Sequence, residues 1–113
     1  MSRKIIDDWF DAFRQKDISL LKLADDFVHS SPFGDIVGGQ RYLEIVRDNA
    51  EAFFAPTLDI LDVIEDGNKF AVRYLVDGNP ACDCIYVAEG AITKIHSYYH
   101  VGKKPTLYDT WLD

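Results

Sequence analysis

The first half of the chain carries apolar residues at the spacing of amphipathic helices. Five of them between Ile5 and Phe13 fall on one side of a helix, with Asp residues between them. Asp17 stands where the N-cap of a second, shorter helix would be. Pro56 stops a third helix, because the residue before a proline is disfavoured in helical conformation. We therefore predict helices over residues 3–16, 18–24 and 40–54, a strand over 27–31 and a loop over 32–38.

The second half alternates between apolar and polar residues, which is the period of a strand with one buried face. Segments around Gly67, Gly78 and Gly90 interrupt the alternation, and each has the composition of a hairpin turn. No repeat or linker divides the sequence. We predict strands over residues 57–65, 70–76, 81–87 and 91–101.

Helices followed by a run of strands favour an α+β fold over a parallel sheet. The N-terminal helices would pack on a strongly curved, mostly antiparallel sheet and form a cone-like α+β barrel. The 113 residues, 48% of them hydrophobic, suffice for one domain with its own core. Residues 1–113 are thus expected to form a single domain.

The net charge of −7 disfavours nucleic acids and anionic membranes as partners, because both need clustered Lys and Arg. No apolar run approaches the roughly 20 residues of a membrane span. The first residues lack the apolar core of a signal peptide, so a cytoplasmic location is expected. Cys82 and Cys84 are the only cysteines, and their separation from His29 does not match the spacing of zinc ligands. We expect neither a metal nor a cofactor.

Local strings spread over residues 3–102 occur in an order known from one family. They are an aromatic helix ending at Lys16-Asp17, Phe27-Val28 leading to Ser31-Pro32-Phe33-Gly34, Gly38-Gly39 before a helix, Phe70 to Val76, Asp83 to Val87, and Gly90-Ala91-Ile92 to Tyr98-Tyr99. In these strings the chain resembles the nuclear-transport-factor-2-like superfamily, and within it the SnoaL-like polyketide cyclase and ketosteroid isomerase branch.

This resemblance implies positions for three functional residues. Ketosteroid isomerase-like members place a general-base Asp before the Pro-x-Gly turn, where this chain has Ser31. They use a Tyr of the first helix as an oxyanion donor, and Trp9 stands at that position. Asp83 matches their second donor, a protonated Asp in an apolar site. From its own context, Ser31 is expected to shape the turn before Pro32 rather than to act as a nucleophile.

Strand alternation places His29 and Ser31 on one face, and by the family match this is the face toward a pocket. Joined with the inner faces of the later strands, it encloses an apolar hollow with a few convergent polar groups, as small-molecule sites do. The residues expected to contact a ligand are Trp9, Phe13, Ser31, Tyr42, Val72, Tyr74, Ile85, Ile95, Ser97 and Tyr99.

Two classes of function fit such a pocket. In the first, the protein is a cofactor-free isomerase, cyclase or hydratase acting on a small hydrophobic molecule, with His29 and Asp83 as acid–base pair and Tyr74 or Tyr99 as donor. This requires His29 and Asp83 to lie at most one water bridge apart. In the second, the pocket binds a hydrophobic ligand or a partner protein without catalysis. His29 would then bond a backbone carbonyl, and hydroxyl groups would satisfy Asp83.

The opposite sheet face is a candidate interface. Tyr86, His96, Tyr98 and His100 are expected to point outward there, and aromatic residues are enriched at protein interfaces. Members of the resembled family commonly dimerise through this face, so the resemblance implies a homodimer. A metal site on His96 and His100 is excluded, because residues four apart on a strand are roughly 13 Å apart.

Overall fold

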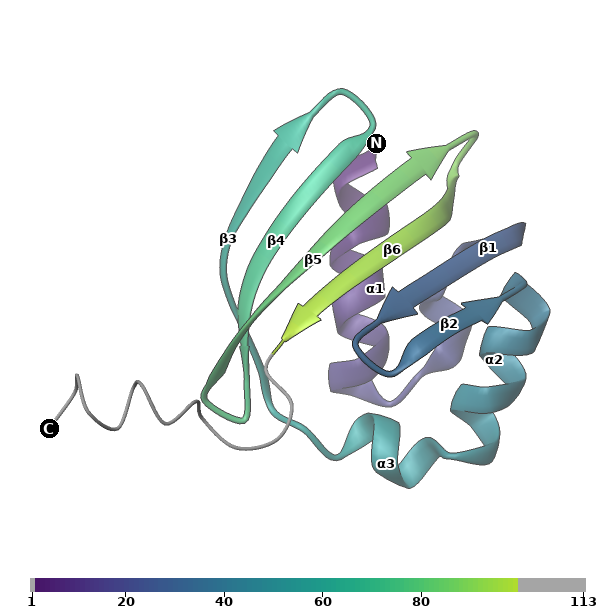
Figure 1. Cartoon of the computed structure of the whole chain (residues 1–113), viewed down its shortest axis with the longest axis vertical. Helices are drawn as coiled ribbons and strands as arrows, with labels where there is room; N and C mark the ends of the chain where they lie inside the picture. Colours follow the sequence, from purple (N-terminus) through teal and green to yellow (C-terminus); the bar gives the residue numbers. More distant parts are fainter. Residues whose placement is uncertain (1, 100–113) are drawn as a thin grey trace, which may run out of the picture.

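A computed structural model describes residues 2–99 as helices packed against one curved sheet (Figure 1). The helical elements are α1 (Ser2–Gln15), the 3₁₀ helix η1 (Ile18–Leu20), α2 (Gly39–Asp48) and α3 (Ala50–Phe54). The strands are β1 (Leu23–Ser31), β2 (Gly34–Val37), β3 (Leu58–Asp66), β4 (Lys69–Val76), β5 (Asn79–Ala88) and β6 (Ala91–Tyr99). Of the strand predicted over 91–101, His100 and Val101 lie outside the described residues. No helix within residues 2–99 is long and apolar enough to cross a membrane.

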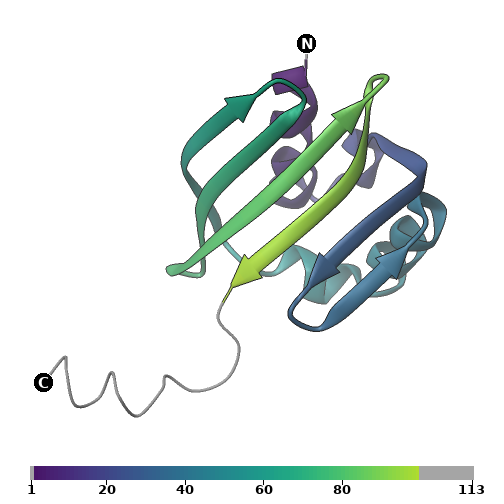
Figure 2. The same ribbon diagram turned by 45° about the horizontal axis from the view of Figure 1, so that its top comes forward.

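The six strands form one mixed sheet in the order β2-β1-β6-β5-β4-β3. Neighbouring strands are antiparallel except β1 and β6, which run in the same direction. The sheet is strongly curved but does not close, and the helices lie against its inner face (Figures 1 and 2). The predicted α+β fold, with N-terminal helices on a curved and mostly antiparallel sheet, is confirmed.

Two-residue turns connect β3, β4, β5 and β6 into a meander, at the three positions that the sequence predicts. In the turn after β4, Asp77 and Gly78 have φ values of 51° and 82°, and in the turn after β5, Glu89 and Gly90 have 52° and 77°. Two consecutive positive φ values are typical of a type I′ turn, whose twist matches that of the paired strands. The turns therefore set the register that brings alternate side chains to the inner face.

The segment after α1 contains less helix and more strand than its pattern predicts. The helix predicted over residues 18–24 is wrong beyond Leu20, because β1 already begins at Leu23. The Asp17 carboxylate does cap the short 3₁₀ turn, accepting hydrogen bonds from the Ser19 backbone N–H at 3.0 Å and hydroxyl at 2.6 Å. The chain then becomes extended because β1 is paired on both of its sides, by β2 and by β6.

Two further predictions are corrected in the middle of the chain. The loop expected over residues 32–38 contains β2, which is paired with β1 although Gly and Asp are poor strand formers. The helix expected over residues 40–54 divides at Asn49 into α2 and α3. The Asn49 side-chain amide donates to the Ile45 carbonyl at 2.8 Å, and such local side-chain bonds compete with continued helix.

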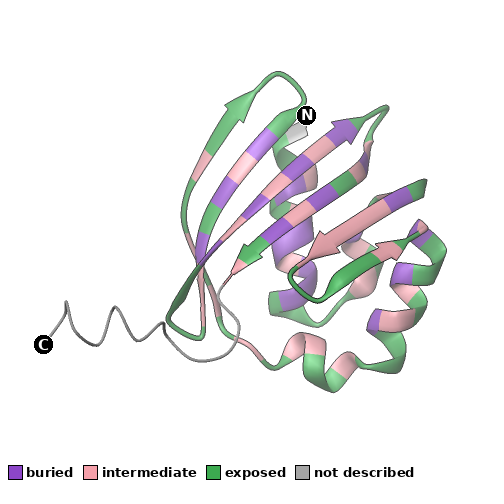
Figure 3. Ribbon diagram, in the orientation of Figure 1, coloured by how far each residue is buried: buried purple, intermediate pink, exposed green. Residues whose placement is uncertain are grey.

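The core lies between α1 and the inner face of the sheet (Figure 3). Burial alternates along the central strands, so that Phe70, Val72 and Tyr74 are buried on β4. α1 contributes the apolar side that its sequence predicts, including the buried residues Ile6 and Phe10. The predicted inner face of the meander is therefore the face that is covered.

Gly39 allows the first turn of α2 to dock on β1. A Cβ atom at this position would overlap the Ala24 carbonyl oxygen, so any larger residue must push helix and strand apart. The neighbouring Gly38 N–H donates to the Phe27 carbonyl at 2.6 Å, which fixes the same approach. The close docking brings Tyr42, from the following turn, into the core with 2% of its surface exposed.

Candidate functional site

A cavity of about 220 Å³ lies between the helices and the inner face of the sheet. Of the lining residues within the described part of the chain, seven are Phe, Tyr or Trp and none is Lys or Arg. Its polar groups are a carboxyl, an imidazole and hydroxyls, so it is an apolar hollow with a few convergent polar groups. The lining residues are Trp9, Phe10, Phe13, His29, Tyr42, Phe53, Pro56, Leu58, Tyr74, Val76, Asp83, Ser97 and Tyr99.

Among residues 2–99, Asp83 is the only acidic residue that lines the cavity, and 3% of its surface is exposed. It lies on β5 directly opposite Ser97 of β6. The Tyr74 hydroxyl donates a hydrogen bond to Asp83 Oδ1 at 2.9 Å. Burial raises the pKa of the Asp83 carboxyl to about 6, although donors on Ser97, Tyr74 and Trp9 act to lower it. The group is therefore poised to exchange a proton near neutral pH.

His29 reaches the cavity from β1. Its Nε2 lies 3.1 Å from the Ser97 hydroxyl oxygen, and its ring stacks at 6.5 Å on the Trp9 indole. Burial lowers the pKa of His29 to about 4, and the negative charge of Asp35 only partly opposes this. The imidazole is therefore neutral at pH 7, with one ring nitrogen protonated and the other free.

Ser97 stands between the two titratable side chains. Its hydroxyl oxygen contacts the imidazole of His29, and 6% of its surface is exposed. It is the register partner of Asp83 on β6, and its hydroxyl acts to lower the Asp83 pKa. The two titratable groups form no ion pair at pH 7, because His29, with a pKa of about 4, is neutral there.

The aromatic walls hold this polar cluster in place. Trp9 stacks on Tyr42 at 5.7 Å and packs edge-on against Phe13 at 5.0 Å. Phe10 packs edge-on against Tyr74 at 5.2 Å. Burial raises the pKa of both Tyr42 and Tyr74 well above the ordinary value, so both phenols stay protonated and can donate hydrogen bonds.

Most of the residues expected at a pocket line this cavity, and four lie elsewhere. Trp9, Phe13, His29, Tyr42, Tyr74, Asp83, Ser97 and Tyr99 are at its wall. Val72, Ile85 and Ile95 are fully buried core residues on the same sheet face, away from the cavity wall. Alternation along a strand indicates the sheet face on which a side chain lies. It does not indicate whether the side chain reaches the cavity or the packed core beside it.

Ser31, the fourth, belongs to the turn between β1 and β2. Its hydroxyl donates to the Gly34 carbonyl at 3.3 Å and accepts from the Phe33 backbone N–H at 3.2 Å. These two bonds close the turn, as the sequence context of Pro32 suggests, and Ser31 is not among the residues that line the cavity. The family position of a catalytic base therefore holds a turn-forming residue in this chain.

Five lining residues are absent from the expected ligand contacts, although alternation along β4 places one of them, Val76, on the inner face. Phe10 shares the apolar side of α1 with Trp9 and Phe13, so its helical position was an available signal. The others are Phe53, Pro56, Leu58 and Val76, which come from the end of α3, the connection to β3 and the end of β4. Their convergence depends on the break at Asn49, which no periodicity predicts.

The described residues contain no group of three or more His, Cys, Asp or Glu side chains arranged to hold a metal ion. Cys82 and Cys84 are free thiols on the outer face of β5. Burial and the neighbouring Cys84 thiol raise the pKa of Cys82, so its reactive thiolate is disfavoured.

Comparisons with known proteins agree with this fold. Among solved structures, a candidate ketosteroid isomerase from Kribbella flavida has a TM-score of 0.76 at 20% identity, over 92% of this chain and 81% of that one. A candidate polyketide cyclase from Sinorhizobium meliloti has a TM-score of 0.68 at 24% identity, over 86% of this chain and 98% of that one. A nuclear-transport-factor-2-like protein of unknown function from Cytophaga hutchinsonii has a TM-score of 0.69 at 16% identity, over 100% of this chain and 96% of that one.

At these identities the structural likeness establishes the fold and not the activity. None of the curated proteins compared matches the chain. The family model described as a SnoaL-like domain matches residues 6–100. Because that match covers most of the sequence, the chain belongs to the SnoaL-like domain family.

Proposed function

We propose that the protein is a cofactor-independent acid–base enzyme of the isomerase, cyclase or hydratase type. The observation that carries this proposal is the position of Asp83 and His29 at the wall of an apolar cavity, with Ser97 directly opposite Asp83 in the sheet and its hydroxyl oxygen 3.1 Å from His29 Nε2. A general acid or base works best with a pKa near the pH at which it operates, and the pKa of Asp83 is about 6. The folds of structures named as a candidate ketosteroid isomerase and a candidate polyketide cyclase support the same class of chemistry.

The reaction that suits this cluster moves a proton to or from a carbon next to a carbonyl group. Asp83 or His29 takes the proton, and the Tyr99 hydroxyl at the cavity wall is the proposed hydrogen-bond donor to the oxygen on which negative charge develops, because the one Tyr74 O–H proton is given to Asp83. Trp9 and the other aromatic residues give the substrate an apolar wall. No redox or group-transfer step is needed.

The lining residues also limit the substrate. The described residues that line the cavity include no Lys or Arg, and His29 is neutral, so they offer no positive charge to a carboxylate or phosphate. A volume of about 220 Å³ lies below the roughly 300–1,000 Å³ of pockets for drug-sized ligands. We therefore propose a small, uncharged, flat carbonyl compound as the substrate.

Deuterium exchange tests this proposal without knowledge of the natural substrate. The protein is incubated in D₂O with cyclohexenone or α-tetralone, and NMR measures exchange at the carbon next to the carbonyl. Exchange should exceed that of buffer and fall at least about 100-fold in Asp83→Asn, the usual size of a general acid–base contribution. Asp25→Asn, at an exposed position of β1, is the matched control and should retain full exchange.

A separate binding measurement shows which result of the exchange assay would contradict the enzyme proposal. Binding of the ketones is followed through Trp9 fluorescence in a Trp111→Phe background, because the chain has two Trp residues. Bound ketone that exchanges no faster than in buffer would overturn the enzyme proposal. It would support the alternative, a pocket that holds a hydrophobic ligand without catalysis.

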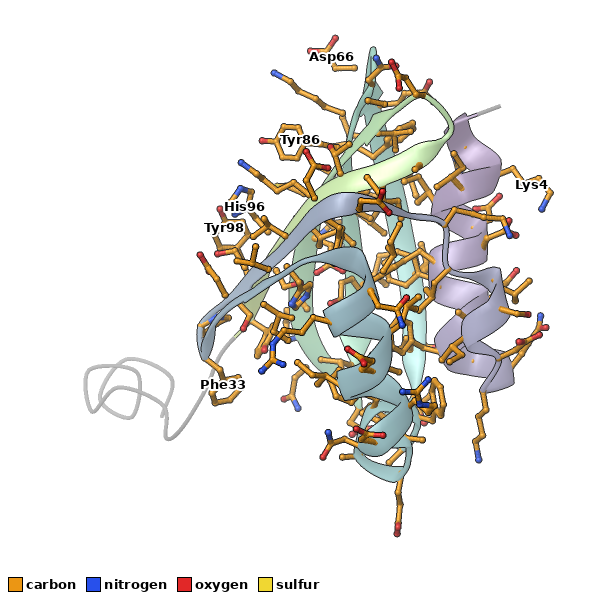
Figure 4. All side chains as sticks on the ribbon, turned by 90° about the vertical axis from the view of Figure 1, so that its right-hand side faces the viewer. Lys4, Phe33, Asp66, Tyr86, His96 and Tyr98 are labelled. Carbon is orange, nitrogen blue, oxygen red and sulfur yellow. The ribbon has the colours of Figure 1, made fainter. Side chains whose placement is uncertain are left out.

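We also propose that two copies pair through the outer face of the sheet. Figure 4 shows Tyr86, His96 and Tyr98 pointing from that face, away from α1. Tyr98 stacks with His96 and is 58% exposed, while Leu61 on β3 is 49% exposed. Exposed aromatic and aliphatic side chains of this kind are typical of the centre of an interface. Sedimentation velocity at micromolar concentration should give a dimer that Tyr98→Lys converts to a monomer, and a monomeric parent protein would contradict this.

A further inference from the structure

We propose that the Ser97 hydroxyl passes a proton between His29 and Asp83, so that the three side chains form one proton-transfer unit. Ser97 is a positioning residue in this unit, because it acts through its two neighbours and need not contact a substrate. The use of the unit in catalysis rests on the proposed function. The coupling of the two protonation states does not, and it can be measured on the protein alone.

The geometry places Ser97 at the one position that serves both partners. It lies directly opposite Asp83 across the β5–β6 ladder. It lies two residues along β6 from Ile95, which is the register partner of His29 on β1. The Ser97 Oγ is therefore diagonal to the imidazole and 3.1 Å from Nε2. Because Ser97 is 6% exposed, bulk water has little access to replace its bonds.

A hydroxyl has one proton to donate, and this ties the states of its neighbours together. When Asp83 is a carboxylate, Ser97 donates to it, and His29 must then donate from Nε2–H to the Ser97 oxygen. The Nδ1 atom is the free base in that state. When Asp83 is protonated, the direction reverses: Asp83 donates to Ser97, Ser97 donates to Nε2, and the His29 proton resides on Nδ1.

The step between these states conserves every proton. A proton taken up at Nδ1 is followed by transfer of the Nε2 proton to Ser97 and of the Ser97 proton to Asp83. One N–H bond forms at Nδ1, one breaks at Nε2, and the added proton ends on the carboxyl group. No charged imidazolium accumulates at any stage.

This path removes the difficulty of using His29 as a base. Burial strongly disfavours a charged imidazole at this site, so His29 by itself would hold a proton poorly. The same burial favours the neutral form of Asp83, which therefore accepts the proton readily. Ser97 connects the group that is placed to receive a proton with the group that is able to keep it.

Other titratable and charged groups face the unit from each packed element. The charges of Asp35 and of His96 act on His29 in opposite directions. Tyr74 and Trp9 donate toward Asp83, and Tyr42 and Tyr99 lie on the same cavity wall. Each of these groups biases the balance between the two states. Trp9 also stacks on His29 and acts as a donor toward Asp83, but an indole N–H only donates and cannot pass a proton on as a hydroxyl can.

The test is ¹⁵N NMR of the His29 ring, recorded while the pH is moved across the Asp83 pKa of about 6. The Nε2–H form should dominate above this pH and the Nδ1–H form below it. The midpoint should coincide with the titration of the Asp83 carboxyl carbon, followed by ¹³C NMR. His29→Gln assigns the resonances, and His96 on the outer face is an internal control whose tautomer should not follow Asp83.

Variants of Ser97 decide whether the hydroxyl is responsible. In Ser97→Ala, Asp83 should still titrate while the His29 tautomer no longer follows it, and Ser97→Thr, which keeps the hydroxyl, should restore the coupling. Backbone amide spectra confirm that each variant is folded. An unchanged His29 tautomer across the Asp83 titration of the parent protein, or unchanged coupling in Ser97→Ala, would overturn the proposal.

The ketone exchange assay then separates this proposal from the proposed function. Ser97→Ala should lower kcat at least tenfold with little change in KM, because the hydroxyl does not bind the ketone. Loss of exchange in the parent protein with the NMR coupling intact would reject the enzymatic role and leave the proton-transfer unit standing. Full kcat in Ser97→Ala would reject the unit as a part of catalysis.

Discussion

Replacing Asp83 by asparagine is expected to change how the stability of the fold depends on pH. Asp83 has a folded pKa of about 6 and an ordinary value of 3.8, so the folded state binds its proton more tightly than the unfolded state. The resulting stability is fully present below pH 3.8 and is lost as the pH rises through 6. The two values differ by about 2, and roughly 1.36 kcal/mol per pKa unit makes this loss about 3 kcal/mol.

His29 acts in the opposite direction over nearly the same range. Its folded pKa of about 4 lies below the ordinary 6.5, so its stability is present above pH 6.5 and is lost as the pH falls toward 4. That change is also about 3 kcal/mol. In the parent protein the contributions of His29 and Asp83 therefore nearly cancel, whereas Asp83→Asn leaves the His29 contribution unopposed.

Urea unfolding at a series of pH values that spans both titrations measures how the free energy of unfolding depends on pH. The free energy of unfolding of Asp83→Asn, relative to the parent, should increase by about 3 kcal/mol between the acid and neutral ends of the series. His29→Gln should show the opposite trend. Asp62→Asn, which breaks an exposed pair with Arg73, is the control and should have a small effect. Parallel curves for the parent and Asp83→Asn would refute the argument that burial shifts the pKa of Asp83.

Substitutions at three further positions test other contacts of the fold and the site. Tyr74→Phe removes a donor that lowers the Asp83 pKa, so ¹³C NMR should find that pKa above its present value of about 6; a lower value would contradict the assignment. Gly39→Ala should reduce the free energy of unfolding by about 1–3 kcal/mol, because the new methyl group overlaps the β1 backbone; an unchanged urea midpoint would show that the helix shifts freely. Trp9→Ala should cost about 3–5 kcal/mol and Trp9→Phe clearly less, since Trp9 is 4% exposed at the centre of the aromatic wall; equal losses would argue against packing as the cause.

The local order of helices and strands follows from the sequence. The apolar side of α1 and the alternation along the later strands record which side of each element is buried, because burial of apolar surface is the main source of stability. The positions of the three hairpin turns follow from Gly in the segments that need positive φ. Alternation along β1, β5 and β6 likewise predicts that His29, Asp83 and Ser97 point to the inner face of the sheet.

Contacts between distant segments were decided only by the tertiary structure. β1 lies beside β6 in parallel, and β2 is a strand because β1 offers it a free edge rather than because Gly-Asp-Ile-Val favours one. The hydrogen bond between His29 and Ser97 joins residues 68 positions apart, and it exists because of that strand pairing. Local patterns can tell which side of an element is buried. They cannot tell which strands become neighbours, because that choice depends on the packing free energy of the whole core.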